Sequence, residues 1–169
     1  TVLGFLESDA IRWWMKPQKG RRSVELASVM VNKGTIYFVG DKAASAGYER
    51  VIDGLLAELD YVTKGIADAM PGSRIDPPVT YVLDELANFE YQGLPELISA
   101  GGGRGRVALA VFQSRSQMSK WGKDEEDAMW DAAVCKIVLP GSASGQELAS
   151  LSDLIGTEWV EKHSYSSTG

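Results

Sequence analysis

Short apolar runs alternate along the chain with segments in which apolar residues recur at helical spacing. Three runs, TIYFVG (35–40), VTYVLD (79–84) and VALAVFQ (107–113), are rich in β-branched and aromatic residues and predict buried strands. The run VCKIVLP (134–140) has the same character and predicts a fourth strand. Because nearly continuous apolar strands are typical of parallel sheets, these runs favour a mainly parallel sheet covered on both faces.

Helical patterns separate the predicted strands. The longest pattern extends from Tyr48 to Ile66, where apolar residues return every three or four positions. Shorter helices are predicted in TVLGFLESDAIRWWM (1–15), SVELASVMVNKG (23–34), LPELISAG (94–101), a segment from about Arg115, Lys123–Ala133 and SGQELASLSDLIG (144–156). Ser23 is the expected N-cap of the second of these helices, and Ser144 and Glu147 have capping-box spacing in the last. The alternation of strands and helices predicts an α/β fold.

Composition narrows the class of protein without identifying it. The 169 residues are 44% hydrophobic and 24% charged, which is ordinary for one globular domain. No apolar run approaches the roughly 20 residues of a membrane-spanning helix. The formal charge of −6 disfavours a protein that coats nucleic acid with its whole surface. The single cysteine, Cys135, lies in an apolar run and is predicted to be a small buried hydrophobe.

Two adjacent acids, Asp84 and Glu85, end the second predicted strand. Ligands of open parallel sheets bind beyond the carboxyl ends of the strands, and Gln113 ends the next strand in the same way. Four hydrophobic residues followed by Asp-Glu form the Walker B pattern of nucleoside triphosphatases. There the first acid holds Mg²⁺, usually through water, and the second orients or deprotonates the attacking water. The alternative is that the acids begin a surface helix, whose dipole favours negative charge.

A glycine-rich turn precedes the third predicted strand. Glycines at 101, 102, 103 and 105 surround Arg104 and Arg106. Glycine permits a tight turn, and the planar guanidinium group matches phosphate oxygens. The alternative is a flexible turn that carries two solvated arginines.

The order of these motifs resembles the TraG/TraD class of type IV secretion coupling proteins. The resemblance covers about residues 24–160 and is most specific from Leu83 to Met118, in LDELANF, GGGRGR and FQSRSQM. Members are RecA-like hexameric ATPases, anchored in the bacterial inner membrane, that move DNA or protein into a secretion channel during conjugation. The resemblance implies a three-layer RecA-like (P-loop NTPase) partial domain.

The same resemblance implies roles for individual residues. Asp84 would bind Mg²⁺ through water, Glu85 would be the catalytic base and Gln113 the polar sensor. Arg104 would reach the nucleotide of a neighbouring subunit, and Arg106 is the alternative candidate for this subunit-interface role because the length of the turn differs among family members. ATP and Mg²⁺ are therefore the cofactors expected for an intact parent protein.

One departure from the family is severe, because the phosphate loop GxxxxGK[ST] is absent. The Gly122-Lys123 pair is followed by Asp124, so WGKDEED is interpreted as a loop that leads into a helix. In the family, an inserted all-helical domain separates the phosphate loop from the Walker B strand. Residues 1–23 are expected to be the tail of that insert, residues 24–160 the Walker B half of the nucleotide-binding domain, and residues 161–169 a polar tail. Such a fragment would be inactive alone and would bind no cofactor tightly.

The expected partners follow from the resemblance. They are further copies of the protein in a hexamer, DNA or a relaxase-type protein substrate or both, and the type IV secretion channel. The membrane would be contacted only through missing N-terminal segments, so that the parent lies at the cytoplasmic face of the inner membrane and the fragment is soluble.

Two other classes of function remain open. The first is a non-catalytic interaction module that docks relaxosome or secretion-substrate proteins and retains a vestigial Asp-Glu pair. The second is a Mg²⁺-dependent nuclease. A nuclease would need further carboxylates at neighbouring strand ends, for which Asp41 is the one candidate.

Overall fold

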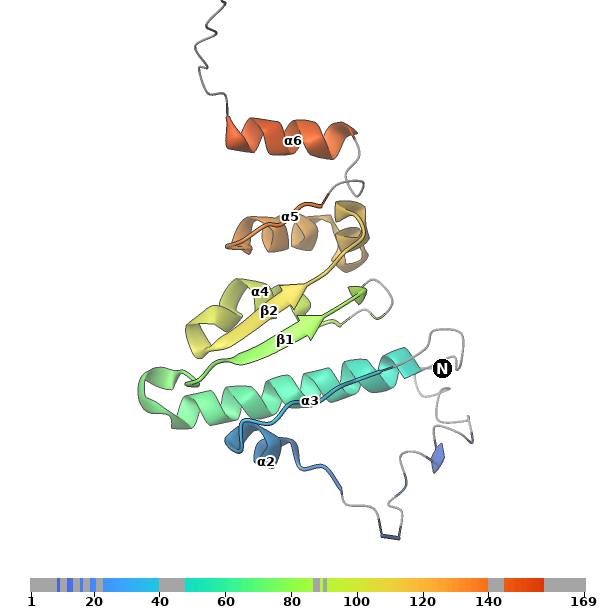
Figure 1. The fold of residues 1–169 in the computed structure, drawn as a ribbon, viewed down its shortest axis with the longest axis vertical. Helices are drawn as coiled ribbons and strands as arrows, with labels where there is room; N and C mark the ends of the chain where they lie inside the picture. The colour runs from blue at the N-terminus through green and yellow to red at the C-terminus, as the bar shows by residue number, and fades with distance from the viewer. Residues whose placement is uncertain are drawn as a thin grey trace, which may run out of the picture. The chain divides into compact units, whose positions relative to one another are not determined.

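The computed structural model describes residues 9, 12–13, 16, 19–20, 23–39, 48–86, 89, 91–139 and 145–156. The chain forms two compact units, Thr1–Lys136 and Ile137–Gly169. The described elements of the first unit (Figure 1) are α2 (Leu26–Val31), α3 (Tyr48–Ala69), the 3₁₀ helix η2 (Pro71–Ser73), β1 (Val79–Leu83), α4 (Leu94–Ala100), the 3₁₀ helix η4 (Gly101–Arg104), β2 (Arg106–Ala110), the 3₁₀ helix η5 (Arg115–Trp121) and α5 (Lys123–Ala132). The second unit contains α6 (Gly145–Ile155).

Strands β1 and β2 form a two-stranded parallel sheet. Val79 lies opposite Arg106, and Leu83 lies opposite Ala110. Parallel neighbours require a crossover connection, and here α4 and η4 lie within it. The mixed α/β fold and the parallel pairing of these two strands are confirmed. The described residues do not include enough strands to establish a complete RecA-like sheet.

One face of this sheet is buried against helices. Tyr81 and Leu83 of β1 point into a core whose other fully buried members are Leu56, Leu59, Leu86, Tyr91, Leu94, Leu97, Met118 and Met129. The opposite face is apolar but exposed: the exposed fractions are 65% for Val82, 44% for Val107 and 51% for Leu109. The described residues of the first unit therefore cover one face of this sheet, and the prediction of a sheet covered on both faces is not confirmed.

Two predicted strands are not formed within the described residues. In residues 35–39 the side chains of Ile36 and Phe38 pack against the core, whereas Tyr37 and Val39 are exposed. This alternation is typical of a strand, but no neighbouring strand supplies backbone hydrogen bonds to the segment. Residues 134–139 likewise join no sheet in the described structure. Cys135 is exposed rather than buried, because its segment does not enter a sheet.

The helices follow the sequence pattern more closely. The long amphipathic helix is confirmed as α3 and ends at Ala69, three residues beyond the last apolar position used to predict it. Helix α2 begins at Leu26 after Glu25, which makes no side-chain capping bond, so Ser23 is not its N-cap. The segment from Arg115 is a 3₁₀ helix, and α5 begins at Lys123 directly after the Trp-Gly pair, as predicted.

The remaining sequence predictions lie wholly or largely outside the described residues. They are the helix at 1–15, the insert tail at 1–23, the nuclease candidate Asp41, the capping box at Ser144 and Glu147, and the polar tail at 161–169. Among the helices that the structure describes, each is too short or too polar to cross a membrane.

Candidate functional site

The acids Asp84 and Glu85 lie in an exposed turn directly after β1. Backbone pairing with the neighbouring segment continues through this turn: Val111 N–H donates to the Leu83 carbonyl over 3.0 Å, and Leu86 N–H donates to the Val111 carbonyl over 3.4 Å. Gln113 follows two residues after Val111 and is also exposed. The sheet therefore brings Asp84, Glu85 and Gln113 to one edge, at the carboxyl ends of both strands.

The backbone at this edge is strained. Glu85 has a φ of +47°, a left-handed conformation that non-glycine residues adopt at a cost of about 1–2 kcal/mol. The Asp84 carboxylate accepts a hydrogen bond from the Glu85 N–H over 3.0 Å and supports the turn. Such strain collects at functional sites. Because the pair lies in a turn, it does not form the first turn of an α-helix, which was the alternative explanation for these acids.

The donor atoms at this edge fit a hydrated magnesium ion. Asp84 and Glu85 offer exposed carboxylate oxygens, the ligands that Mg²⁺ prefers, and Mg²⁺ keeps several of its own waters. Within the described residues, no group of three or more His, Cys, Asp and Glu side chains is placed to enclose a metal ion. Gln113 donates its backbone N–H to the Gln117 side chain over 2.8 Å, which fixes its backbone.

Arg104 and Arg106 lie in opposite environments although they are two residues apart. Arg104 ends η4, and its Nη1 is 2.7 Å from Asp68 Oδ1 in a pair whose side chains are 43% and 58% exposed. Arg106 begins β2, and its side chain is fully buried. Gly105 separates them with a φ of +76°, so that the chain reverses between an exposed and an interior position.

Arg106 is the buried centre of an ionic cluster that the sequence did not reveal. Its Nη1 contacts Asp60, its Nη2 is 3.0 Å from Glu96 Oε1, and Lys64 Nζ lies 2.7 Å from Asp60 Oδ2 and also contacts Glu96. The cluster joins α3, α4 and β2. Burial opposes the charged form of Arg106, but the hydrogen bonds to Glu96 and Asp60 outweigh it and raise the pKa of Arg106. The signal in the sequence was an i,i+4 Asp-Lys pair on the buried side of α3.

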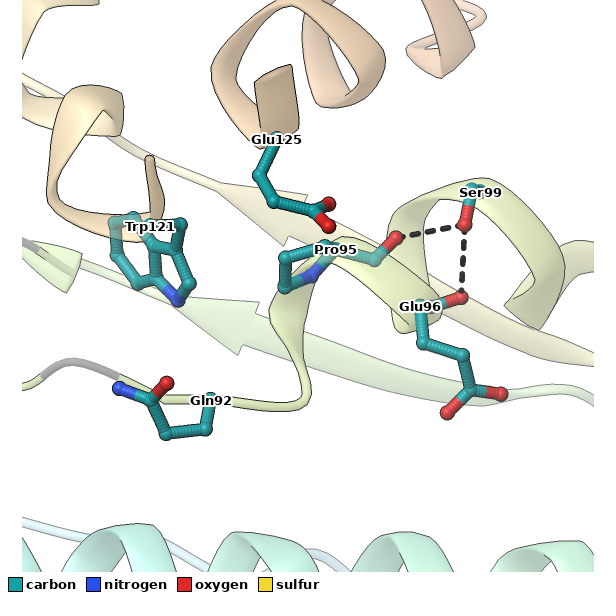
Figure 2. A pocket seen from close by; sticks show the side chains of 6 residues that line it. All are labelled: Gln92, Pro95, Glu96, Ser99, Trp121 and Glu125. Carbon is teal, nitrogen blue, oxygen red and sulfur yellow. Dashed lines mark hydrogen bonds between the residues drawn. The ribbon is translucent and has the colours of Figure 1, made fainter. Parts of the chain in front are cut away.

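A separate pocket of about 480 Å³ lies beside α4, η5 and α5. Figure 2 shows its lining residues, which are Gln92, Pro95, Glu96, Ser99, Trp121 and Glu125. The Trp121 indole N–H donates to the Tyr91 carbonyl over 2.8 Å. The ring also meets Phe112 edge to face, with centroids 6.2 Å apart. No local sequence pattern indicates this pocket, because its lining residues come from α4, η5, α5 and the turn before α4.

Comparison with known proteins identifies the family to which this chain belongs. A family model described as the TraM recognition site of TraD and TraG matches residues 78–169, which include β1, the acid pair, the arginine turn and the pocket. The chain therefore belongs to this family, and the predicted resemblance to TraG/TraD-type coupling proteins is confirmed. No curated protein and no solved structure matches the chain.

Proposed function

We propose that this chain contributes the Walker B half of the ATPase motor of a TraG/TraD-type coupling protein, which drives DNA or protein or both into a type IV secretion channel. The observation that carries the proposal is the single sheet edge shared by Asp84, Glu85 and Gln113, at the carboxyl ends of two parallel strands. This is where open α/β sheets bind ligands. Family membership supports the coupling-protein part of this proposal.

The roles of the edge residues follow from their chemistry. Asp84 holds the water shell of Mg²⁺, which neutralises charge on the β- and γ-phosphates of ATP when the nucleotide is bound. Glu85 accepts a proton from the attacking water or orients it, and its strained backbone holds the carboxylate in an exposed turn. Gln113 reaches the same edge from β2 and positions the water or contacts the γ-phosphate. The phosphate loop itself would come from outside these 169 residues.

Arg104 is the residue proposed to act on a neighbouring subunit of a hexamer. Its pair with Asp68 is exposed at both ends, so it contributes at most about 1 kcal/mol and can be exchanged for a phosphate contact. Arg106 is enclosed by Asp60 and Glu96 and has no exposed surface to offer a partner. The hexamer, and a membrane anchor in a longer parent at the cytoplasmic face of the bacterial inner membrane, belong to the same proposal.

Recognition of a relaxosome protein is a second candidate function. The matching family is described as the TraM recognition site of TraD and TraG, and the match covers residues 78–169. We infer that the same region of this chain docks TraM. A docking role does not require nucleotide hydrolysis, so in this case Asp84 and Glu85 would be a vestigial pair without a catalytic role.

The two functions are separated by substitutions in the full-length coupling protein. Glu85→Gln keeps the shape of the side chain but removes its basicity, so ATP turnover should fall at least about 100-fold while Mg·ATP binding survives. Asp84→Asn should instead weaken the metal-dependent part of nucleotide binding. Glu58→Gln, on the exposed side of α3, is the matched control and should change neither.

If neither Asp84→Asn nor Glu85→Gln alters ATP binding or turnover, the motor assignment fails. TraM binding, measured by calorimetry on the same proteins, should be unaffected by both. The 169-residue chain alone should show no ATP binding, because it lacks the backbone amides and lysine of a phosphate loop. Tight Mg²⁺-dependent binding of ATP by this chain alone would contradict its proposed position in the motor.

A further inference from the structure

The pocket beside α4 combines flat apolar walls with carboxylates. Trp121 and Pro95 supply the apolar surface, and Glu125 and Glu96 supply the negative charge (Figure 2). The cavity of about 480 Å³ is large enough to hold one long side chain of a partner. It is distinct from the sheet edge that carries Asp84 and Glu85, neither of which lines it.

The indole ring of Trp121 is fixed before anything binds. Its N–H is used by the Tyr91 carbonyl, and its ring is held against Phe112 at an interplanar angle of 88°. The part of the ring that lines the pocket therefore has no hydrogen bond to offer. A ring held in this way attracts a cation through its quadrupole and loses little entropy on binding.

The two glutamates differ in how far their charge is already neutralised. Glu96 is contacted by Lys64 and Arg106, which hold its carboxylate at the edge of the pocket. Glu125 lies in the first turn of α5, and within the part of the chain that the structure describes no Lys or Arg forms an ion pair with it. Its neighbour Glu126, in contrast, pairs with Arg115 and Lys123. The pocket thus offers one uncompensated carboxylate beside a fixed aromatic ring.

The remaining lining groups offer acceptors. The Ser99 hydroxyl donates to the Pro95 carbonyl over 2.8 Å, so its oxygen can still accept a hydrogen bond. Gln92 also lines the pocket. Every charged group that lines the pocket is negative, so an acidic or phosphorylated ligand would be repelled and a basic one attracted.

We propose that this pocket binds the side chain of a single arginine from a partner protein. The guanidinium group would lie against Trp121, donate hydrogen bonds to Glu125, and reach Ser99 with a remaining N–H group. Arginine is preferred over lysine because its plane stacks on an aromatic ring and its five donors match several acceptors. The proposal rests on the proposed recognition function for the identity of the partner, but its chemistry can be tested without that partner.

The test uses indole N–H resonances of the ¹⁵N-labelled 169-residue chain, with the Trp121 signal assigned from Trp121→Phe. The probe is the blocked peptide Gly-Ser-Arg-Ser-Gly, and its matched control carries citrulline, which has the same shape without the charge. The arginine peptide should shift the Trp121 signal with a Kd on the order of 1 mM. The citrulline peptide should bind at least about tenfold more weakly.

Variants locate the interaction. Glu125→Gln should weaken the arginine peptide about tenfold, whereas Asp131→Asn, at an exposed acid on the same helix, should not. Equal binding of both peptides, unchanged binding by Glu125→Gln, or no shift of the Trp121 signal would each overturn the proposal. Peptide binding supports the arginine pocket even if TraM does not bind the chain, so failure of the recognition function is distinguishable from failure of the pocket.

Discussion

At the scale of single residues, removal of the Arg106 side chain should lower the free energy of unfolding most. It is fully buried and faces Asp60, which is also almost fully buried. Arg106→Met preserves much of the volume but leaves a carboxylate inside the protein with Lys64 as its remaining partner, so we expect a loss of about 3 kcal/mol in the free energy of unfolding. Arg104→Met is the control and should cost at most about 1 kcal/mol. Urea unfolding of the two variants measures the difference, and equal losses would contradict the assignment of Arg106 to the interior.

Glu96 should make the stability of the folded state depend on pH. Burial alone would raise its pKa, but the hydrogen bonds from Lys64 and Arg106 outweigh burial and lower the pKa below its ordinary value of 4.5. A carboxyl whose pKa is lower in the folded state stabilises that state above the unfolded pKa, and the contribution is lost as the pH falls through the folded pKa. The free energy of unfolding should therefore decline below about pH 4.5. In Glu96→Gln this decline should be shallower; an identical pH profile would exclude Glu96 as its source.

The sequence could not distinguish the two arginines, because their environments depend on distant residues. Both stand among glycines in GGGRGR. The partner that fixes Arg106 is Asp60, 46 positions earlier on α3. The acid pair was easier to predict, since an apolar run that ends in Asp-Glu is a local pattern. The strained φ of Glu85 was not predictable, because it follows from the continued pairing of Leu86 with Val111.

At the scale of elements, the turn between η4 and β2 depends on the absence of a side chain at Gly105. A Cβ there would overlap the carbonyl oxygen of Ile75, and the φ of +76° disfavours any side chain. Ile75 N–H and Val79 N–H also donate to the carbonyls of Arg104 and Gly105, which ties the turn to the start of β1. Gly105→Ala should therefore reduce the free energy of unfolding by about 2 kcal/mol or more.

Gly103→Ala is the matched control for this turn. Nothing lies within 4 Å of a Cβ at Gly103, and its φ is not in the left-handed region. Its effect on stability should stay within about 0.5 kcal/mol. Thermal unfolding of the two variants tests the prediction. Similar melting temperatures for both would show that the Ile75 carbonyl can move aside.

The sequence predicted helices and strands well where the local pattern of apolar residues is enough to determine them. The helical spacing of α3 and the apolar runs of β1 and β2 each needed no information from elsewhere in the chain. Residues 35–39 and 134–139 carry the same strand-like composition, yet no described strand pairs with them. Strand propensity is a local property, but a strand forms only where a neighbour supplies hydrogen bonds. The pocket beside α4 was missed for a related reason, because three elements form it together.

At the scale of the whole molecule, the exposed apolar face of the sheet is the feature least expected of a domain that is stable alone. Parallel sheets are normally covered on both faces, whereas Val82, Val107 and Leu109 are exposed here. In the proposed motor domain, further strands and helices would cover these side chains. The sequence correctly predicted that β1 and β2 are parallel, but not how many strands the described sheet contains. The apolar pattern does not say which segments pair with these two strands.

The last prediction tests the proposed hexamer through Arg104. A guanidinium group supplied by a neighbouring subunit stabilises charge on the transferred phosphoryl group and contributes about 10³–10⁵ in rate in nucleotide hydrolases. In the full-length coupling protein, Arg104→Ala should therefore preserve ATP binding and assembly but abolish turnover, whereas Asp68→Asn, which frees Arg104 from its local pair, should not.

Mixing two inactive proteins then decides whether Arg104 acts across a subunit boundary. A Glu85→Gln subunit retains its arginine, and an Arg104→Ala subunit retains its catalytic acid. At some interfaces of a mixed assembly, an intact arginine will face an intact acid, so the mixture should regain part of the ATPase activity that neither variant shows alone. Asp84→Asn mixed with Glu85→Gln is the control: both defects lie at the same sheet edge, so every active site contains one of them and activity should not return. A mixture of Arg104→Ala and Glu85→Gln that assembles but stays inactive at every ratio would contradict the trans role in an assembly whose subunits hydrolyse ATP independently.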